Sequence, residues 1–157
     1  MPEEYRNIYK ICRKYVRLTQ EEAAERLGVS VESLRAYETG QRIPPDDVVS
    51  LMADLYNALH LIIWHSRAKN DMYKRVVPEV QPKSLLQAAV TFNNRMEDFF
   101  LGGKLRRLLR IVEDNIVDPT EQEEYNAIMA ELHGINGAEI ELRCAKQEGG
   151  SSCREFP

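Results

Sequence analysis

The sequence predicts an all-α protein, in which a domain of five short helices precedes a smaller C-terminal helical region. Two observations support this fold class. Apolar residues recur at steps of three and four through most of the chain, which is the spacing of one face of an α-helix. Helix start and stop signals divide this pattern at short intervals. The 157 residues, of which 43% are hydrophobic, are enough for one or two small globular domains.

The first predicted helix lies before Thr19. Its apolar residues repeat at steps of three to four, so the helix should be amphipathic and pack on the helices that follow. The residues on this apolar face are Tyr5, Ile8, Tyr9, Ile11, Cys12 and Tyr15.

Two short helices joined by a tight turn come next. Thr19 can cap the free amides of the first turn, and Glu22, three residues later, can reach back to the amide of Thr19, which makes a capping box. Gly28 can adopt the left-handed backbone conformation that ends a helix. Ser30 is the N-cap of the second helix, which should end near Thr39.

A fourth and a fifth helix complete the first domain. Pro44 and Pro45 break the chain and restart it with proline at an early helical position. The apolar residues that follow predict a helix that ends near Tyr56. The apolar run from Leu59 to Trp64 predicts a fifth helix, buried on much of its surface and too short to span a membrane.

This order of features resembles the lambda-repressor/Cro-type (XRE-like) helix-turn-helix DNA-binding domain. The resemblance rests on the segment LTQEEAAERLGVS, on the exit Tyr37-Glu38-x-Gly40 and on the GQRIPP connection, and it covers roughly residues 5–66. It implies that the second helix of the motif lies in the major groove of DNA while the first crosses the phosphate backbone. We therefore expect residues 1–70 to form a DNA-binding domain.

The resemblance also assigns base-facing positions. Arg35 could bind O6 and N7 of guanine, Glu32 could accept from N4 of cytosine, and Val31 or Ala36 could contact a thymine methyl group. Ser33 is the fifth position of this set. Members of the family often carry Gln, Arg, Asn or Thr where this chain has Val31 and Ala36, and Glu32 repels phosphate. A solvated helix face is therefore the alternative interpretation of Glu32 and Arg35.

Four polar residues are candidates for phosphate contacts. Two match family positions at the start of a helix and in the exit loop, and two are cations near the end of the first helix. In that order they are Gln20, Arg42, Lys14 and Arg17.

Arg13 and Glu38 have a different interpretation. Family members commonly pair an arginine of the first helix with the glutamate that follows the last apolar residue of the second helix of the motif. The resemblance thus implies a structural ion pair that fixes the position of this helix, with a small net contribution to stability after desolvation.

The charge distribution limits how the first domain could bind DNA. Residues 1–75 carry 12 Lys plus Arg against 11 Asp plus Glu, net +1, and residues 76–157 carry 9 against 14, net −5. A nearly neutral domain can bind DNA if its basic groups gather on one face. Weak counterion release per copy favours two domains acting together, so we expect a homodimer on a two-fold site.

The second half begins after a predicted extended linker over residues 71–83, where two prolines oppose a helix. Ser84 and Gln87 form another capping box, which opens a helix that Gly102-Gly103 breaks. A shorter helix follows. The last helix should start at Asp118, with a proline next to it.

The apolar stripe of the last helix is heptad-like but short, and Gly134 and Gly137 should weaken it. We expect residues 84–145 to form antiparallel hairpins or a bundle that serves oligomerisation or another interaction. Residues 146–157 have linker chemistry, which predicts a flexible tail. The order of motif, V-x-P-E-V linker and acidic helical region is similar to phage-type regulators in prophage clusters of Gram-positive bacteria.

These patterns predict a cytoplasmic transcription regulator that binds double-stranded DNA as a dimer, and the resemblance implies a repressor. The alternative is a protein-interaction module that keeps the fold without tight DNA reading. No nucleophile-base pair supports an enzyme, and no cofactor is expected.

No metal is expected either. His60 and His65 are five residues apart, not the four that would place both on one helical face. An odd count of three cysteines and the lack of a signal peptide fit reduced thiols in the cytoplasm, with Cys12 in the core.

Overall fold

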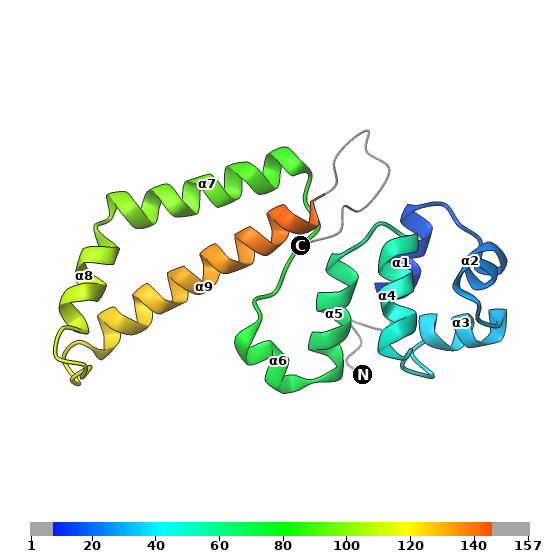
Figure 1. Cartoon of the computed structure of the whole chain (residues 1–157), viewed down its shortest axis with the longest axis horizontal. Helices are drawn as coiled ribbons and strands as arrows, with labels where there is room; N and C mark the ends of the chain where they lie inside the picture. Colours follow the sequence, from blue (N-terminus) through cyan, green and yellow to red (C-terminus); the bar gives the residue numbers. More distant parts are fainter. Residues whose placement is uncertain (1–7, 146–157) are drawn as a thin grey trace. The chain divides into compact units, whose positions relative to one another are not determined.

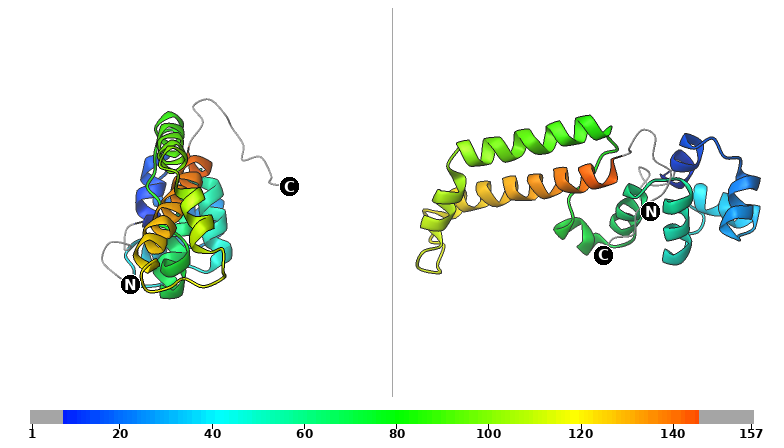
Figure 2. Two further views of the ribbon diagram at one scale, coloured as in Figure 1. Left: turned by 90° about the vertical axis from the view of Figure 1, so that its left-hand side faces the viewer. Right: turned by 45° about the horizontal axis from the view of Figure 1, so that its top comes forward.

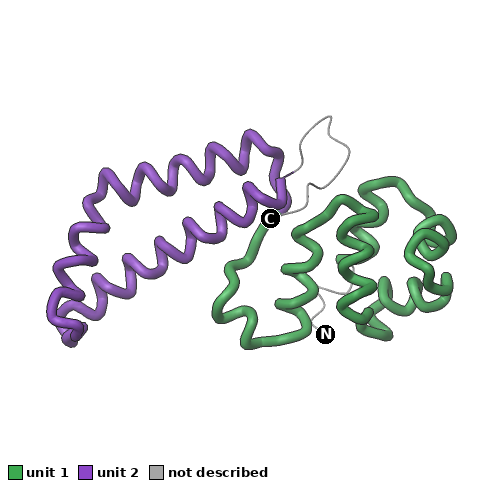
Figure 3. Tube along the Cα trace, in the orientation of Figure 1, with its two compact units in different colours: residues 1–81, 146–157 green, residues 82–145 purple. Residues whose placement is uncertain are grey.

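The computed structural model describes residues 8–145, and in this range the chain folds into α-helices without a β-strand (Figure 1). This observation confirms the all-α fold class. The described chain divides into two compact units, residues 8–81 and residues 82–145 (Figure 3). Each helix of the described chain is too short or too polar to span a lipid bilayer. Residues 146–157, for which a flexible tail is expected, lie outside the described range.

Six helices build the described part of the first unit. One core joins the first five, and its largest fully buried side chains include Tyr9, Leu34, Met52, Tyr56 and Leu61. The short loops between these helices leave little freedom in how they pack. The helices are α1 (Ile8–Tyr15), α2 (Gln20–Leu27), α3 (Val31–Glu38), α4 (Asp46–Leu55), α5 (His60–Lys69) and α6 (Asp71–Val76).

The predicted start and stop signals of α2 and α3 are confirmed. Thr19 Oγ1 accepts from the Glu22 amide at 3.1 Å, and a Glu22 carboxylate oxygen accepts from the Thr19 amide at 2.8 Å. Gly28 ends α2 with a φ of +66°, a backbone angle that residues with a Cβ rarely adopt. Ser30 caps α3 by accepting from the Ser33 amide at 3.1 Å. Local chemistry alone therefore sets both ends of the turn.

The prediction of extended chain over residues 71–83 is wrong for its first part, where α6 forms. Asn70 caps this helix, because its side-chain oxygen accepts from the Met72 amide at 2.9 Å. The first proline of the segment, Pro78, comes only after α6 has ended, so it does not oppose the helix.

The extended remainder is attached to the first unit. Trp64 Nε1 donates to the Val80 carbonyl at 3.0 Å, and the Arg67 guanidinium donates to the Val77 carbonyl. Pro78 and Val80 are buried. Two side chains of α5 thus satisfy backbone acceptors of the segment, and the first unit continues beyond residue 70 to Gln81.

The second unit is an antiparallel hairpin of two long helices, with a short helix at its closed end. The helices are α7 (Leu85–Leu101), α8 (Lys104–Ile111) and α9 (Gln122–Cys144). Figure 2 shows α7 and α9 side by side in the view turned about the horizontal axis. The predicted capping box opens α7, since Ser84 Oγ accepts from the Gln87 amide at 3.3 Å and Gln87 Oε1 accepts from the Ser84 amide at 3.2 Å.

The last helix starts later than predicted. Asp118 Oδ1 accepts from the amides of Thr120 at 2.7 Å and of Glu121 at 3.1 Å. These bonds close a turn that ends before α9 begins at Gln122. Asp118 therefore does accept hydrogen bonds from the amides that follow it, but in the loop before α9 rather than at the start of the helix.

The two glycines of α9 do not interrupt it. The helix continues through both to Cys144, because tertiary contacts with α7 compensate for their low helix propensity. Gly137 is buried, and the end of the Arg95 side chain lies where a Cβ of Gly134 would stand. The absence of a side chain at Gly134 therefore leaves room for the end of the Arg95 side chain from α7.

A polar chain of side chains joins α1, α4 and α5. The Tyr9 hydroxyl lies 2.8 Å from His65 Nδ1, and His65 Nε2 lies 3.0 Å from Asp46 Oδ1. Lys69 Nζ donates to the same carboxylate oxygen at 2.6 Å. Burial and then the charge of Asp46 raise the pKa of Tyr9, which therefore stays neutral. His65 is a packing residue that links two helices to α4.

The other histidine of α5 also has a packing role. His60 Nε2 lies 3.6 Å from the sulfur of Cys12, and the His60 ring meets Trp64 edge-on with 4.6 Å between centroids. Cys12 is buried in the core, as expected. Within residues 8–145, no three His, Cys, Asp or Glu side chains gather in a way that could hold a metal ion.

Asp46→Asn should reduce the loss of stability at acidic pH. The hydrogen bond from Lys69, followed by that with His65, holds the pKa of the Asp46 carboxyl below its usual value. Such a carboxylate stabilises the fold above its unfolded pKa of about 4, and this contribution disappears as the pH falls through the lower folded value. Wild-type urea midpoints should therefore fall more steeply below about pH 4 than those of the variant.

The matched control is Asp47→Asn, which removes the neighbouring exposed carboxylate from the same helical turn. It should keep the wild-type pH dependence. Equal slopes for wild type and Asp46→Asn would show that the contacts of Asp46 do not stabilise the fold.

Candidate nucleic-acid interface

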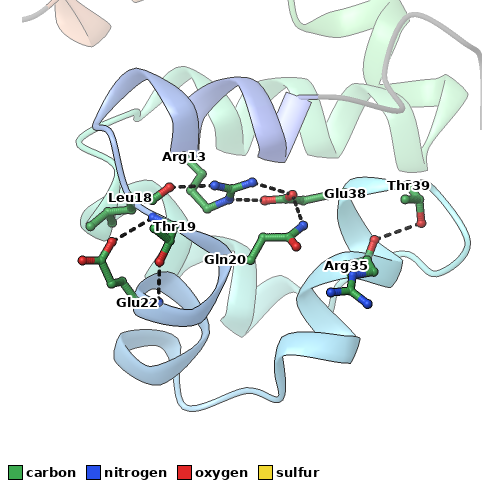
Figure 4. Close-up of polar contacts among 8 residues, drawn as sticks. All are labelled: Arg13, Leu18, Thr19, Gln20, Glu22, Arg35, Glu38 and Thr39. Atoms are coloured by element: carbon green, nitrogen blue, oxygen red, sulfur yellow. Dashed lines mark hydrogen bonds and ion pairs between the residues drawn. The ribbon is translucent and has the colours of Figure 1, made fainter.

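The helix α3 has one side in the core and one side in solvent. Leu34 and Tyr37 are buried, whereas Glu32 and Arg35 are exposed. Among residues 8–145 the Arg35 side chain makes no hydrogen bond or ion pair, and its contact with Thr39 in Figure 4 is through the backbone oxygen. Of the expected base-facing residues, Glu32 and Arg35 are those that the fold leaves fully available.

The other three base-facing candidates lie at the edge of this surface. Val31, Ser33 and Ala36 are half-buried, and Val31 packs against the core. The Ser33 hydroxyl accepts a hydrogen bond from Ser30 Oγ at 2.9 Å. One acceptor site of Ser33 is therefore used by the N-cap of α3, which the sequence pattern did not reveal.

Arg13 and Glu38 form a buried, bidentate ion pair (Figure 4). Arg13 Nε donates to Glu38 Oε1 at 2.5 Å, and Nη2 donates to Oε2 at 2.8 Å. The side chains are only 7% and 1% exposed. The Arg13 Nη1 group also donates to the Leu18 carbonyl at 2.6 Å. The hydrogen bond to Glu38 raises the pKa of Arg13, which stays charged, so the pair ties α1, the α1–α2 connection and α3 together.

Gln20 has a structural contact that its phosphate assignment did not include. Its Nε2 donates to Glu38 Oε2 at 2.7 Å (Figure 4). Because an amide nitrogen carries two protons, one donor remains for another acceptor. Gln20 therefore connects the start of α2 to the ion pair, and it can contact a phosphate only with its second proton.

Tyr56 completes the surroundings of Glu38. It follows α4 directly and is fully buried, and its hydroxyl has no hydrogen-bond partner in the described part of the chain. Burial and then the charge of Glu38 raise the pKa of Tyr56 and keep it neutral. Apolar periodicity placed Tyr56 in the core, but no sequence signal placed it beside the ion pair.

Two of the basic candidates lie near the end of α1. Lys14 and Arg17 are exposed, and Arg17 has a φ of +60°. The Arg17 amide donates to the Lys14 carbonyl at 3.0 Å and the Leu18 amide to the Arg13 carbonyl at 3.3 Å, which is a Schellman ending. Glycine usually occupies this position. An arginine is thus held in a strained conformation on an exposed surface.

The third basic candidate, Arg42, lies in the exit loop after α3. Its guanidinium carbon lies 5.8 Å from the centroid of the Tyr37 ring, and its amide donates to the Ala36 carbonyl at 3.2 Å. The cation-π contact limits the orientations of this exposed side chain. Arg42 is therefore partly pre-oriented next to the end of α3.

The exposed surface of the two-helix motif has mixed charge. Its acidic residues repel a phosphate backbone and so oppose the attraction that its basic residues exert. The favourable field must come from cations at its borders, such as Lys14, Arg17 and Arg42, rather than from net charge. The exposed charged residues of α2 and α3 are Glu21, Glu22, Glu25, Arg26, Glu32 and Arg35.

Comparison with known families agrees with this geometry. Residues 10–63 match the family model described as helix-turn-helix, a range that runs from α1 into α5. The first unit is therefore a helix-turn-helix domain with a lambda-repressor-like fold, the class of domain found in DNA-binding regulators. Searches of curated proteins and of solved structures gave no match.

Arg13→Met should reduce the free energy of unfolding by about 3 to 5 kcal/mol, because it leaves the Glu38 carboxylate buried without a counter-ion. The double variant Arg13→Met/Glu38→Leu should recover much of this loss, since an apolar pair avoids the desolvation cost. Urea unfolding of the wild type, both single variants and the double variant gives the coupling energy. A double variant no more stable than Arg13→Met would contradict this account of the pair.

Arg17→Gly should stabilise the fold and weaken DNA binding. Glycine adopts the left-handed conformation without the steric cost, so unfolding should require about 1 kcal/mol more. Loss of one phosphate contact should lower the salt dependence of DNA affinity by about one unit of slope. Lys14→Gln is the control, because it removes a neighbouring cation without relieving backbone strain. Unchanged stability of Arg17→Gly, or an unchanged salt slope, would refute the corresponding half of the prediction.

Proposed function

We propose that this protein is a cytoplasmic, sequence-specific DNA-binding transcription regulator that acts as a homodimer through its C-terminal helices. One observation carries the proposal: α3 is fixed by the Arg13–Glu38 pair while Glu32 and Arg35 project from it into solvent. Base reading needs a helix whose position is fixed relative to the groups that hold the phosphates. A helix anchored at its last residue and exposed on the opposite side meets that need.

Each polar group of α3 has a role in this proposal. The planar fork of Arg35 suits the O6 and N7 atoms of guanine, and the Glu32 carboxylate suits the amino group of cytosine. Val31 and Ala36 offer apolar contact to a thymine methyl group from the edge of the surface. Ser33 keeps its hydroxyl proton for a base or a phosphate, because its bond with Ser30 uses it as an acceptor.

Phosphate contacts would fix the register on the DNA. Lys14 and Arg17 lie at the end of α1, and Arg42 lies beyond α3, so the cations are found on both sides of the two-helix motif in the chain. The second amide proton of Gln20 adds a neutral donor at the start of α2. These four residues position the domain, whereas α3 supplies sequence preference.

A homodimer and a repressive role extend the proposal. A nearly neutral domain gains little from counterion release as a single copy, and a two-fold dimer doubles the phosphate contacts on a palindromic site whose half-sites lie about one helical turn apart. Bound in this way, the protein would exclude other proteins from the same stretch of DNA, which is the simplest route to repression. A phage-type repressor is the specific form that we propose.

A second candidate function is a protein-interaction module that has kept the helix-turn-helix fold. The mixed charge of α2 and α3 supports it, as does the use of Ser33 and Gln20 in contacts within the domain. Such a module would use the exposed face of α3 for a protein partner and would show no preferred DNA sequence.

Selection of bound duplexes from a random pool separates the two functions. The wild type should enrich a palindromic site, and Arg35→Glu should bind the winner at least about tenfold more weakly, since a lost bidentate contact costs about 1 to 3 kcal/mol and the new charge repels DNA. Arg75→Glu, the same charge reversal at an exposed residue of α6, is the matched control and should bind nearly as the wild type does. No enrichment, or equal binding by Arg35→Glu, would favour the interaction module.

A further inference from the structure

The short helix α8 of the second unit has an outward side with a regular pattern. Leu108 and Ile111 face the small core that Phe99 and Ile128 share with them. Two apolar and two basic side chains are exposed on the other side, each pair four residues apart, so they form two adjacent rows along the helix. These residues are Leu105, which is 45% exposed, Leu109, which is 61% exposed, and Arg106 and Arg110.

This outward side is basic in an acidic unit. α8 carries four basic and no acidic residues, while residues 82–145 contain 7 Lys plus Arg and 11 Asp plus Glu. Lys104 pairs with Glu131, and Arg107 pairs with Glu124 at 3.3 Å. Arg110 lies 3.8 Å from Glu124 yet stays 71% exposed, and within residues 8–145 Arg106 has no ion pair. The positive charge of the outer row is therefore available to a partner.

The first half of α9 has a complementary outward side. Tyr125, Ile128 and Leu132 face the core of the unit. The opposite side carries the exposed carboxylate of Glu123 and, four and seven residues later, the exposed Ala127 and Ala130. This side of α9 thus has an acidic group at its start, followed by small apolar side chains. The outward side of α8 has basic groups next to leucines.

We propose that these two faces form the contact between copies of the homodimer, with α8 of one copy against the first half of α9 of the second copy. The proposal rests on the homodimer of the proposed function and specifies its surface. A two-fold axis lets one unit use both faces at once, since each copy supplies one face to each of two equivalent contacts. Opposite charges and apolar side chains then meet in both contacts.

The small core of the unit is an independent reason for such a partner. Only three large apolar side chains, Phe99, Ile111 and Ile128, form the buried cluster of residues 82–145. A helical unit of this size is marginal when folded alone. Covering the exposed leucines of α8 with a second copy adds apolar burial where the unit lacks it.

Charge reversal on each face tests the contact with the full-length protein. Arg106→Glu should give two contacts of like charge in its homodimer, and so should Glu123→Arg. Each variant should raise the dimer dissociation constant at least about tenfold, as measured by sedimentation equilibrium over a dilution series. Helix content should stay near the wild-type value because both side chains are exposed, whereas the melting temperature should fall to the extent that the dimer contact stabilises the second unit.

Mixing the two variants provides the decisive measurement. In the mixed dimer, Glu at position 106 of one copy meets Arg at position 123 of the other, and the second contact keeps the wild-type pair. Equimolar mixtures should therefore recover dimers of near wild-type affinity, detected as heterodimers by native mass spectrometry. Glu97→Arg, the same reversal at an exposed residue of α7, is the matched control and should dimerise normally.

The outcomes separate this surface from the proposed function. Wild-type protein that stays a single copy at all concentrations would overturn both the surface and the homodimer. Wild-type dimers with variants that dimerise normally, or weakened variants that do not recover on mixing, would overturn the surface alone. Sequence-specific DNA binding is measured separately by duplex selection, so neither result is confused with a failure to read DNA.

Discussion

The buried ion pair between Arg13 and Glu38 fixes the part of the first unit on which the proposed activity depends. It joins the end of α3 to α1, and through Leu18 and Gln20 it also fixes the connection into α2. Each carboxylate oxygen of Glu38 accepts from Arg13, and one also accepts from Gln20, so the charge is compensated by directed donors. Such a pair adds little net stability compared with apolar packing, but it allows few alternative positions of α3. The main effect of the pair is therefore to fix the orientation of α3 rather than to add stability.

That constraint explains how a surface of mixed charge could still read DNA. Exposed carboxylates of α2 and α3 oppose a general attraction to phosphate, so non-specific binding should be weak for one copy. Under the proposed function, specific binding would then depend on a few correctly placed groups, such as Arg35, and on cations at the borders of the motif. Arg17 illustrates the cost of such placement, because it occupies a left-handed position where glycine would fold with less strain.

The second unit has the opposite character. Its hairpin is held by two long helices with few fully buried side chains, and α8 leaves leucines and arginines in solvent. A unit with so small a core and two complementary exterior faces gains most from association with a second copy. In such a dimer the first unit of each copy would supply DNA specificity. The hairpin would hold the two copies together, so that two such units act on one site.

Local chemistry determined much of the fold from the sequence alone. Several features depend only on residues that are close together in the sequence, so they could be predicted from it. They are the capping boxes at Thr19 and Ser84, the left-handed glycine at position 28 and the apolar periodicity of α1 to α5. The exposed positions of Glu32 and Arg35 follow from the same periodicity. The ion pair of Arg13 and Glu38 was expected only through resemblance, since the two residues are 25 positions apart.

Tertiary structure decided what depends on distant partners. Only folding shows that Gln20 binds Glu38, that Tyr56 lies beside that carboxylate, and that Trp64 and Arg67 attach the segment after α6 to α5. Helix propensity also misjudged α9, because contacts with α7 outweigh the cost of its two glycines. These features depend on side chains brought together by packing, and no local pattern records which partners the packed core will bring into contact.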